Sequence, residues 1–423
     1  MKVFAGFPGR ARRSCAGALA AMCLIAATPM ASAQDSTPTA AGYTPAGGLI
    51  TAVFIGSFPI PEIETLEQVL FKGYTTPPPR YPVDTYRIRF GSADFDGSGA
   101  VITAELFVPR YTARTERPVL VFGSGTTGIG DACAPSLEQW EVRHFGDYRA
   151  NMLAYAGQGF IVVFPDYLGF NDPDRPQRYF SKLAEGHVML DSARAVFQYF
   201  RTGRQVVEPL PKVFVAGYSQ GGHAAFAAAD LWKSYAPDVP LAGAIGFGGA
   251  TDVETLLREG PAYAPLIFYT YSVMYGSGDV DPAALLQDRF VKTLAADVNT
   301  LCIDQFQTYY GYDGSKLYRP EFHRALYARE LAANYPSLAR RLAENGTGLD
   351  GHGLPALVLD GGTDFIVTPA SHLRFVEALR KAGSRVRCLA YQGVPHKGIR
   401  QAGFQESVDW MEQISRGEPA PEN

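Results

Sequence analysis

Residues 213–230, VFVAGYSQGGHAAFAAAD, decide the fold. They have the pattern of a short apolar strand, a sharp turn at residues 217–221 (GYSQG) and an alanine-rich helix. The glycines two residues before and after Ser219 have no Cβ, so the strand and the helix can approach each other closely. The serine hydroxyl then stands clear of the strand end, near the amide groups that begin the helix, where developing negative charge is favoured. We therefore predict that Ser219 is a nucleophile.

Short apolar runs of the same kind occur on both sides of this segment. Runs that are apolar throughout are typical of parallel strands buried on both faces. Segments long enough for helices separate most of them, which is the alternation of an α/β domain with a mostly parallel central sheet. The expected strands are 119–122, 160–164, 213–216, 241–247, 356–359 and 386–391, and the expected helices are 148–156, 184–201, 220–233, 369–381 and 398–414.

One connection between expected strands is far longer than the others. About 100 residues separate Gly248 from Leu354, too many for a short loop and one helix. The segment is rich in aromatic residues and has helix-like stretches at 282–296 and 321–343, so we expect an inserted helical cap. The expected organisation is a signal peptide (1–33), an N-terminal extension (34–85), a core in two parts (86–249 and 351–416), a cap (250–350) and a flexible tail (417–423). Within the extension we expect an irregular course over 59–82. The first part of the core is expected to open with a hairpin over 86–109.

The first 33 residues predict an export signal. Four basic residues precede a nearly uninterrupted apolar run over 15–30, and residues 31–33, ASA, have the small-x-small form that signal peptidase cuts. The apolar run is shorter than the roughly 20 residues of a spanning helix, which favours a cleaved signal over an anchor. We expect cleavage after Ala33, a secreted or periplasmic protein, and no integral membrane span afterwards.

The charge of the chain argues against nucleic acid as a partner, and its cysteines suggest one disulfide. Without residues 1–33 the chain has 34 basic and 42 acidic residues, a net charge of −8, and no basic run that could follow a phosphate backbone, which argues against nucleic acid. Cys133, Cys302 and Cys388 remain, and an odd number in an oxidising compartment suggests one disulfide and one buried thiol. No spacing of histidine and cysteine residues suggests a zinc site, and we expect no metal.

A serine nucleophile needs a base and an acid, which follow it in the order serine, acid, histidine in this arrangement of strands. Of the histidines beyond Ser219, His396 lies in a loop after the last strand, at the same sheet edge as Ser219, and we choose it as the base. Asp360 and Asp364 compete for the role of acid. We favour Asp364, because it lies further out in the loop and can reach back to the imidazole, and we expect Asp360 to be structural.

The oxyanion formed on attack at an ester needs two backbone donors. One is expected to be the amide of Gln220, the residue after the nucleophile. The other is expected from the glycine-rich loop at 123–128, GSGTTG, which follows the strand at 119–122.

Three further segments resemble the secretory lipases of the lipase A type: residues 125–136 (GTTGIGDACAPS), 166–170 (DYLGF) and 190–195 (LDSARA). With the serine turn, Asp364 and His396, the resemblance extends from about residue 123 to residue 396. It implies an α/β-hydrolase fold with a helical cap over the acyl site and hydrolysis of carboxylic esters without a cofactor. It also implies that Thr127, or failing that Thr126, supplies the second oxyanion amide, and that Cys133 pairs with Cys302.

The expected function is thus that of a secreted lipase or esterase with a Ser219–His396–Asp364 triad. Its substrate would be a small-molecule or lipid ester, which allows transient contact with a lipid interface. Two alternatives stay open at this point. One is a serine peptidase or amidase on the same fold, and the other is a secreted binding protein on a catalytically silent hydrolase scaffold.

Overall fold

The computed structural model describes residues 46–139, 144–202 and 205–422. These residues belong to one unit that extends from Tyr43 to Asn423. The signal peptide expected over 1–33 lies outside the described residues, and so does most of the lead-in to the first strand.

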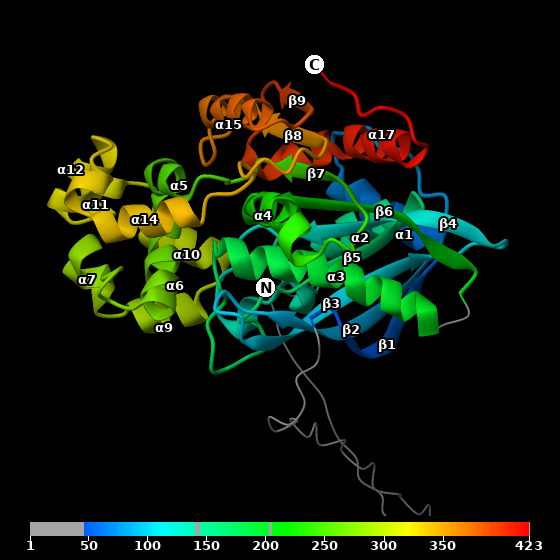
Figure 1. Cartoon of the computed structure of the whole chain (residues 1–423), viewed down its shortest axis with the longest axis horizontal. Coiled ribbons are helices and arrows are strands. Elements are labelled where there is room, and N and C mark those ends of the chain that lie inside the picture. The colour runs from blue at the N-terminus through cyan, green and yellow to red at the C-terminus, as the bar shows by residue number, and fades with distance from the viewer. Residues whose placement is uncertain (1–45, 140–143, 203–204, 423) are drawn as a thin grey trace, which may run out of the picture. The chain divides into compact units, whose positions relative to one another are not determined.

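A nine-stranded sheet forms the centre of the molecule, in the order β1-β2-β3-β5-β4-β6-β7-β8-β9 (Figure 1). β1, β2, β3 and β5 pair antiparallel, whereas β5, β4, β6, β7, β8 and β9 pair parallel. The strands are β1 (Leu49–Phe58), β2 (Val83–Ala93), β3 (Gly99–Pro109), β4 (Thr115–Gly123), β5 (Ile161–Pro165), β6 (Val207–Tyr218), β7 (Leu241–Phe247), β8 (Ala356–Gly361) and β9 (Val386–Tyr391). The expected hairpin over 86–109 is present as β2 and β3.

Helices cover both faces of this sheet, with α3 and α4 in front of it and α1 behind it in Figure 1. On one face, Phe404 of α17 packs its ring centroid 4.8 Å from Phe71 and 4.6 Å from Tyr155 of α2. On the other, α3 packs against α4, and Phe226 of α4 meets Phe375 of α15 at 4.9 Å. The helices are α1 (Ile60–Leu70), α2 (Tyr148–Gly157), α3 (Lys182–Thr202), α4 (Gln220–Tyr235), α15 (Pro369–Lys381), α16 (Ile399–Ala402) and α17 (Phe404–Ser415).

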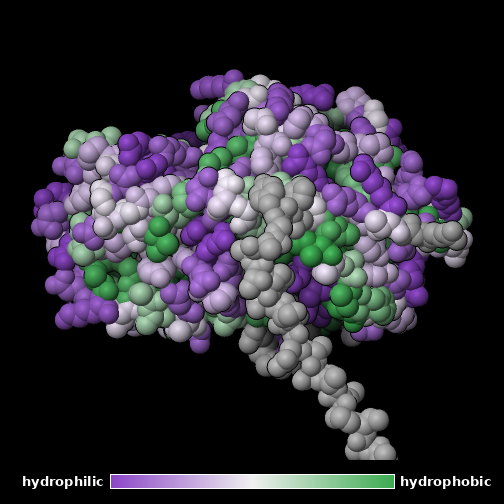
Figure 2. Space-filling model, turned by 60° about the horizontal axis from the view of Figure 1, so that its bottom comes forward, coloured by the Kyte–Doolittle hydropathy of each residue, from purple (hydrophilic) through white to green (hydrophobic). Residues whose placement is uncertain are grey.

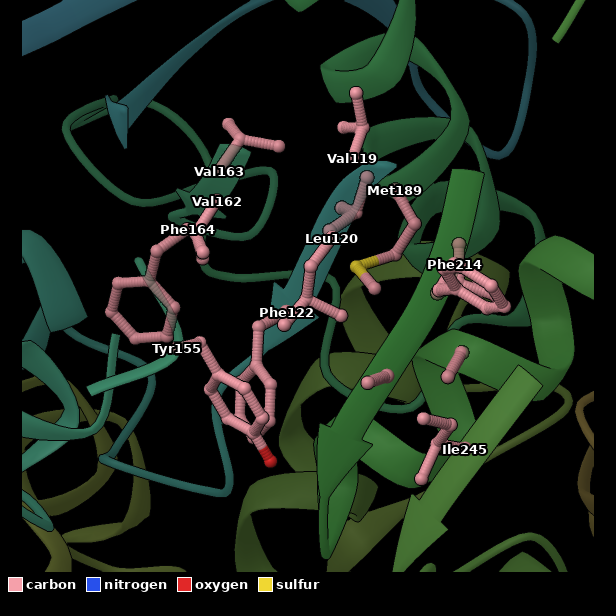
Figure 3. Packing of buried hydrophobic residues seen from close by; sticks show 14 of the residues in the cluster. Val119, Leu120, Phe122, Tyr155, Val162, Val163, Phe164, Met189, Phe214 and Ile245 are labelled. Atoms are coloured by element: carbon pink, nitrogen blue, oxygen red, sulfur yellow. The ribbon is translucent and has the colours of Figure 1, made fainter. Parts of the chain in front are cut away.

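The apolar strands predicted from the sequence are buried because helices lie on both sides of them. Val119, Leu120 and Phe122 of β4 have no exposed surface, and Phe122 lies against Tyr155 with ring centroids 6.0 Å apart (Figure 3). Removing such apolar surface from water is the main favourable term in folding. This core fixes the carboxyl ends of the parallel strands, from which the loops described below emerge.

A separate group of helices follows β7 and precedes β8, on the left of the sheet in Figure 1. It has its own apolar cluster, which includes Phe268, Phe306 and Phe322. We call this segment the cap. Its helices are α5 (Val253–Glu259), α6 (Ala264–Tyr275), α7 (Pro282–Leu285), α8 (Asp288–Val291), α9 (Leu294–Thr300), α10 (Ile303–Tyr310), α11 (Gly314–Leu317), α12 (Pro320–Tyr327), α13 (Leu331–Asn334) and α14 (Pro336–Glu344).

The two long cap helices predicted from the sequence are each broken into three. The stretch 282–296 is interrupted at Leu286, which is extended and forms an isolated bridge with Tyr318. The stretch 321–343 is interrupted at Arg329, where φ is +61°, and again at Tyr335. Tyr335 precedes Pro336, and a residue before proline is disfavoured in the helical conformation. Each of the two helix-like stretches is therefore a series of short helices. The expected helix over 398–414 is likewise divided, into α16 and α17.

The N-terminal extension is more ordered than predicted. β1 is the edge strand of the sheet and pairs with β2, and β2 begins at Val83, inside the expected extension. The irregular course expected over 59–82 is wrong for α1, which starts with prolines in its first turn and buries Ile63 and Leu70. Proline suits the first turn of a helix, because its fixed φ is helical and its missing amide has no partner there anyway.

The side of the molecule in Figure 2 is mostly hydrophilic, with apolar residues in small separate areas. Among the described residues, no helix combines the length and the apolar character that crossing a bilayer requires.

A disulfide joins Cys133, which follows the glycine-rich loop after β4, to Cys302 at the start of α10. The two cysteines are 169 residues apart in the sequence, so the bond ties the cap to the core. Cys388 of β9 is outside the disulfide and is half-buried rather than fully buried as expected.

Replacing both Cys133 and Cys302 with serine is expected to lower the free energy of unfolding by about 2–5 kcal/mol, because a cross-link across a long loop restricts the unfolded chain. Thermal unfolding followed by circular dichroism measures this effect. Cys388→Ser is the control and is expected to shift the midpoint much less. An equal shift in both variants would mean that the cross-link has no special role.

Candidate active site

Ser219 lies at the turn between β6 and α4, with φ of +55° and ψ of −112°. A positive φ is uncommon for a residue other than glycine and marks a locally strained backbone. The turn can be this tight only because of its glycines. A Cβ on Gly217 would lie 2.2 Å from the backbone of Gly221, and one on Gly221 would lie 2.0 Å from the carbonyl oxygen of Gly123. The sequence therefore holds the Ser219 hydroxyl at the end of the central strand.

The structure brings the three predicted residues together. Ser219 Oγ lies 3.0 Å from Nε2 of His396, and Nδ1 of the same ring lies 2.6 Å from Oδ2 of Asp364. His396 begins the short helical turn after β9, and Asp364 lies in the turn after β8. Ser219 is 6% exposed, and His396 and Asp364 are each 4% exposed. Such a chain can pass a proton from the hydroxyl to the imidazole while the carboxylate holds the ring.

The second oxygen of Asp364 fixes this carboxylate in place. Oδ1 accepts hydrogen bonds from the backbone amides of Ile366 (2.8 Å) and Val367 (3.0 Å). Both oxygens are thus committed, one to His396 and one to two amides, and hydrogen bonds of this kind favour the charged carboxylate.

Asp360, the competing acid in the sequence, faces a different residue. Its Oδ1 lies 3.6 Å from Nε2 of His372 on α15, which is longer than a normal hydrogen bond. Burial, and then the neighbouring Asp364, raise the pKa of Asp360 to about 7, and burial lowers the pKa of His372 to about 4. Ligand atoms of Asp360, Asp364 and His372 lie within 4.8 Å of one another, which is compact enough for a metal ion. Asp364, however, already uses both oxygens in hydrogen bonds.

Gln220, the predicted first oxyanion donor, is the first residue of α4, where backbone amides have no acceptor within the helix. Its side chain donates to Glu185 Oε1 (2.7 Å), and Glu185 Oε2 lies 2.6 Å from His223 Nδ1. All three residues are buried. Glu185 could not be predicted from the sequence, because it lies 34 positions before the serine and no motif links the two.

The glycine-rich loop after β4 is held by aromatic hydroxyls. The amide of Gly125 donates to Tyr148 Oη (2.7 Å), and Thr126 Oγ1 shares a hydrogen bond with Tyr179 Oη (2.7 Å). Thr126 lines the cavity that contains Ser219. Thr127 is not among the lining residues of that cavity, and its carbonyl accepts from the amide of Ile303 in the cap (2.8 Å). The choice of Thr127 as oxyanion donor therefore stays a prediction, and cavity lining favours Thr126.

The DYLGF segment supports the same loop from behind. The buried carboxylate of Asp166 accepts from the amide (2.8 Å) and the hydroxyl (2.6 Å) of Ser136 and from Nδ2 of Asn171 (3.0 Å). Tyr167 of the same segment contacts the loop directly, because its hydroxyl donates to the carbonyl of Ser124 (2.8 Å).

The cavity around Ser219 has a volume of about 320 Å³. The core contributes Ser219, His396 and Tyr218 to its wall, and the cap contributes Tyr263 and Ile303. A larger cavity of about 680 Å³ lies between the cap and α15, but Ser219 does not line it. We take the smaller cavity as the candidate active site, because of the two it is the one lined by Ser219.

Comparison with known proteins finds similarity to lipases. Residues 150–272 match the family model of the secretory lipases. The chain is 36% identical over 107 residues to lipase A of Moesziomyces aphidis, an alignment that covers 25% of this chain and 21% of that protein. It is 29% identical over 186 residues to a secreted triacylglycerol lipase of Malassezia globosa, covering 42% of this chain and 37% of that protein. The matches thus span well under half the length of these relatives.

Solved structures resemble the whole described fold. The rice cell wall degrading esterase LipA from Xanthomonas oryzae aligns with a TM-score of 0.68 and 17% identity, over 88% of this chain and 97% of that one. Candida antarctica lipase A aligns with a TM-score of 0.67 and 19% identity, over 90% and 86% of the two chains. The expected α/β-hydrolase fold is confirmed, and so is the resemblance to the secretory lipases of the lipase A type.

Proposed function

We propose that this protein is a secreted carboxylic ester hydrolase that works through an acyl-enzyme on Ser219. The observation that carries the proposal is the continuous chain from Ser219 Oγ through His396 to Asp364, with separations of 3.0 and 2.6 Å. It lies in a cavity between the core and the cap, in a fold shared with lipases and esterases.

In the proposed first half-reaction, His396 takes the proton of Ser219 as the hydroxyl oxygen attacks the ester carbonyl. Asp364 stabilises the imidazolium that forms. The backbone amide of Gln220, with an amide of the loop at Thr126 or Thr127, binds the oxyanion. His396 then gives the proton to the leaving alcohol. A water molecule, activated by the same imidazole, releases the acid in the second half-reaction.

Several observations support export of the protein to the periplasm or to the outside of the cell. The disulfide between Cys133 and Cys302 is of the kind that persists in oxidising compartments. The N-terminal sequence has the pattern of a cleaved signal, and the relatives in Malassezia globosa are named as secreted lipases.

The size of the cavity predicts which esters are preferred. A volume of about 320 Å³ is at the small end for ligand pockets, and the cap that closes it is tied to the core by the disulfide and by the bond from Ile303 to Thr127. We expect kcat/KM for p-nitrophenyl butyrate to exceed that for p-nitrophenyl palmitate by at least about ten-fold. A ten-fold difference corresponds to about 1.4 kcal/mol of lost transition-state binding. A panel of esters of increasing acyl length measures this, and equal values along the panel would contradict the size argument.

The alternatives give different results in the same assay. An amidase or peptidase would hydrolyse a butyryl anilide about as well as the matching ester. A silent binding protein would hydrolyse neither and would not react with a fluorophosphonate probe. We expect the ester to be hydrolysed and the probe to label the protein.

A further inference from the structure

Asp360 and His372 form a second carboxylate–imidazole pair directly behind the acid of the triad. Asp360 is the last residue but one of β8, and His372 is the fourth residue of α15. Oδ1 of Asp360 and Nε2 of His372 are 3.6 Å apart, and neither atom has a hydrogen-bond partner among the described residues. Both atoms are shielded from solvent, and a buried polar atom without a partner is especially unfavourable when it is charged.

The charges around the pair disfavour an ionised Asp360. Asp364 in the following turn carries the nearest negative charge, Cys388 of β9 lies on another side, and His396 lies beyond Asp364. No lysine or arginine forms an ion pair with Asp360 within the described ranges. Two buried carboxylates this close are hard to ionise together, and one of them keeps its proton. Asp364 has amide donors and His396 to stabilise its charge, so Asp360 is the one that stays neutral.

We propose that Asp360 and His372 act as an uncharged, proton-holding pair behind Asp364, and that loss of the Asp360 proton delays the activation of His396 as the pH rises. The inference rests on the proposed function of Ser219, His396 and Asp364. Asp360 acts through Asp364 and touches no substrate, so it is a positioning residue.

The direction of the effect follows from electrostatics. An ionised Asp360 adds negative charge behind Asp364, and this charge stabilises the protonated imidazole of His396. A protonated His396 cannot accept the Ser219 proton. Burial and Asp364 raise the pKa of Asp360 to about 7, so this charge develops in the neutral pH range. Below that range Asp360 is neutral and has no such effect.

The test compares the wild type with Asp360→Asn, because an asparagine has the shape of the neutral acid and cannot ionise. We expect the acid limb of the kcat/KM profile for p-nitrophenyl butyrate to move to lower pH by roughly half a pH unit in the variant, with the plateau kept within about two-fold. Glu377→Gln, which removes an exposed carboxylate from the same helix α15, is the matched control and should leave the limb in place.

Histidine NMR gives a second measurement that needs no substrate and so separates this inference from the proposed function. In the wild type, the His372 ring is expected to stay neutral down to about pH 5, because burial lowers its pKa to about 4. If Asp360→Asn does not fold, the wild-type spectra of His372 alone decide.

Two results would overturn the proposal. One is a His372 ring that is charged at neutral pH, since the pair would then be an ordinary ion pair. The other is an unchanged acid limb of the kcat/KM profile in folded Asp360→Asn. A failure of Ser219→Ala to remove esterase activity would refute the proposed function instead, and the NMR titrations would still report on the pair.

Discussion

Ser219→Ala is expected to lower kcat/KM for p-nitrophenyl butyrate by at least about 10⁴-fold, since loss of the nucleophile in a serine hydrolase leaves only binding and the oxyanion donors. Among the described residues, Ser219 is the one whose hydroxyl is hydrogen-bonded to Nε2 of His396, at 3.0 Å. Labelling by a fluorophosphonate should disappear together with the activity.

The loss should not come from unfolding. Alanine removes a single oxygen and meets the same positive φ of +55° that serine already has. The variant should therefore unfold within a few degrees of the wild type. Ser234→Ala removes an exposed hydroxyl near the end of α4, the helix that follows Ser219. It is the matched control and should keep full activity. Retained activity and labelling in Ser219→Ala would refute the assignment of the nucleophile.

The second large effect is expected for Asp364→Asn, with a loss of about 10³–10⁴-fold in kcat at neutral pH. The reason is geometric. The amides of Ile366 and Val367 donate to Oδ1 of residue 364, so the side-chain oxygen of an asparagine must take that place. Its NH₂ group then faces Nδ1 of His396 and forces this nitrogen to accept a hydrogen bond. The proton of the ring moves to Nε2, which can no longer take the proton of Ser219.

Comparison with Asp360→Asn separates the two carboxylates. Both substitutions remove one carboxylate from the same loop, yet the first should abolish most of the activity and the second should keep the plateau. Steady-state kinetics over a range of pH measures both. The opposite ranking would make Asp360 the acid that orients His396.

The sequence was sufficient for the parts of the molecule that depend on local pattern. The apolar runs predict the parallel strands β4 to β9, because a strand covered on both faces has no polar alternation. The glycines around Ser219 predict the tight turn, and the order of the strands predicts that residues 364 and 396 lie at its edge. Asp364 was preferred over Asp360 on reach alone, and the amides of Ile366 and Val367 supply a reason that no pattern contains.

The errors arise where tertiary contacts override local preference. Helix α1 was missed because its prolines suggest an irregular chain, although they suit a first turn. The cap helices were predicted too long, since the bridge between Leu286 and Tyr318 joins segments 32 residues apart. Contacts between residues far apart in the chain produce no periodic pattern in the sequence, so they could not be predicted from it.

The bond between Cys133 and Cys302 bears on when the protein matures. Cys133 follows the glycine-rich loop, and Cys302 directly precedes α10. The amide of Ile303, the next residue, donates a hydrogen bond to the carbonyl of Thr127. In a reducing cytosol this bond does not persist. A newly made chain would therefore lack this covalent tie between the glycine-rich loop and the cap until it reached an oxidising compartment.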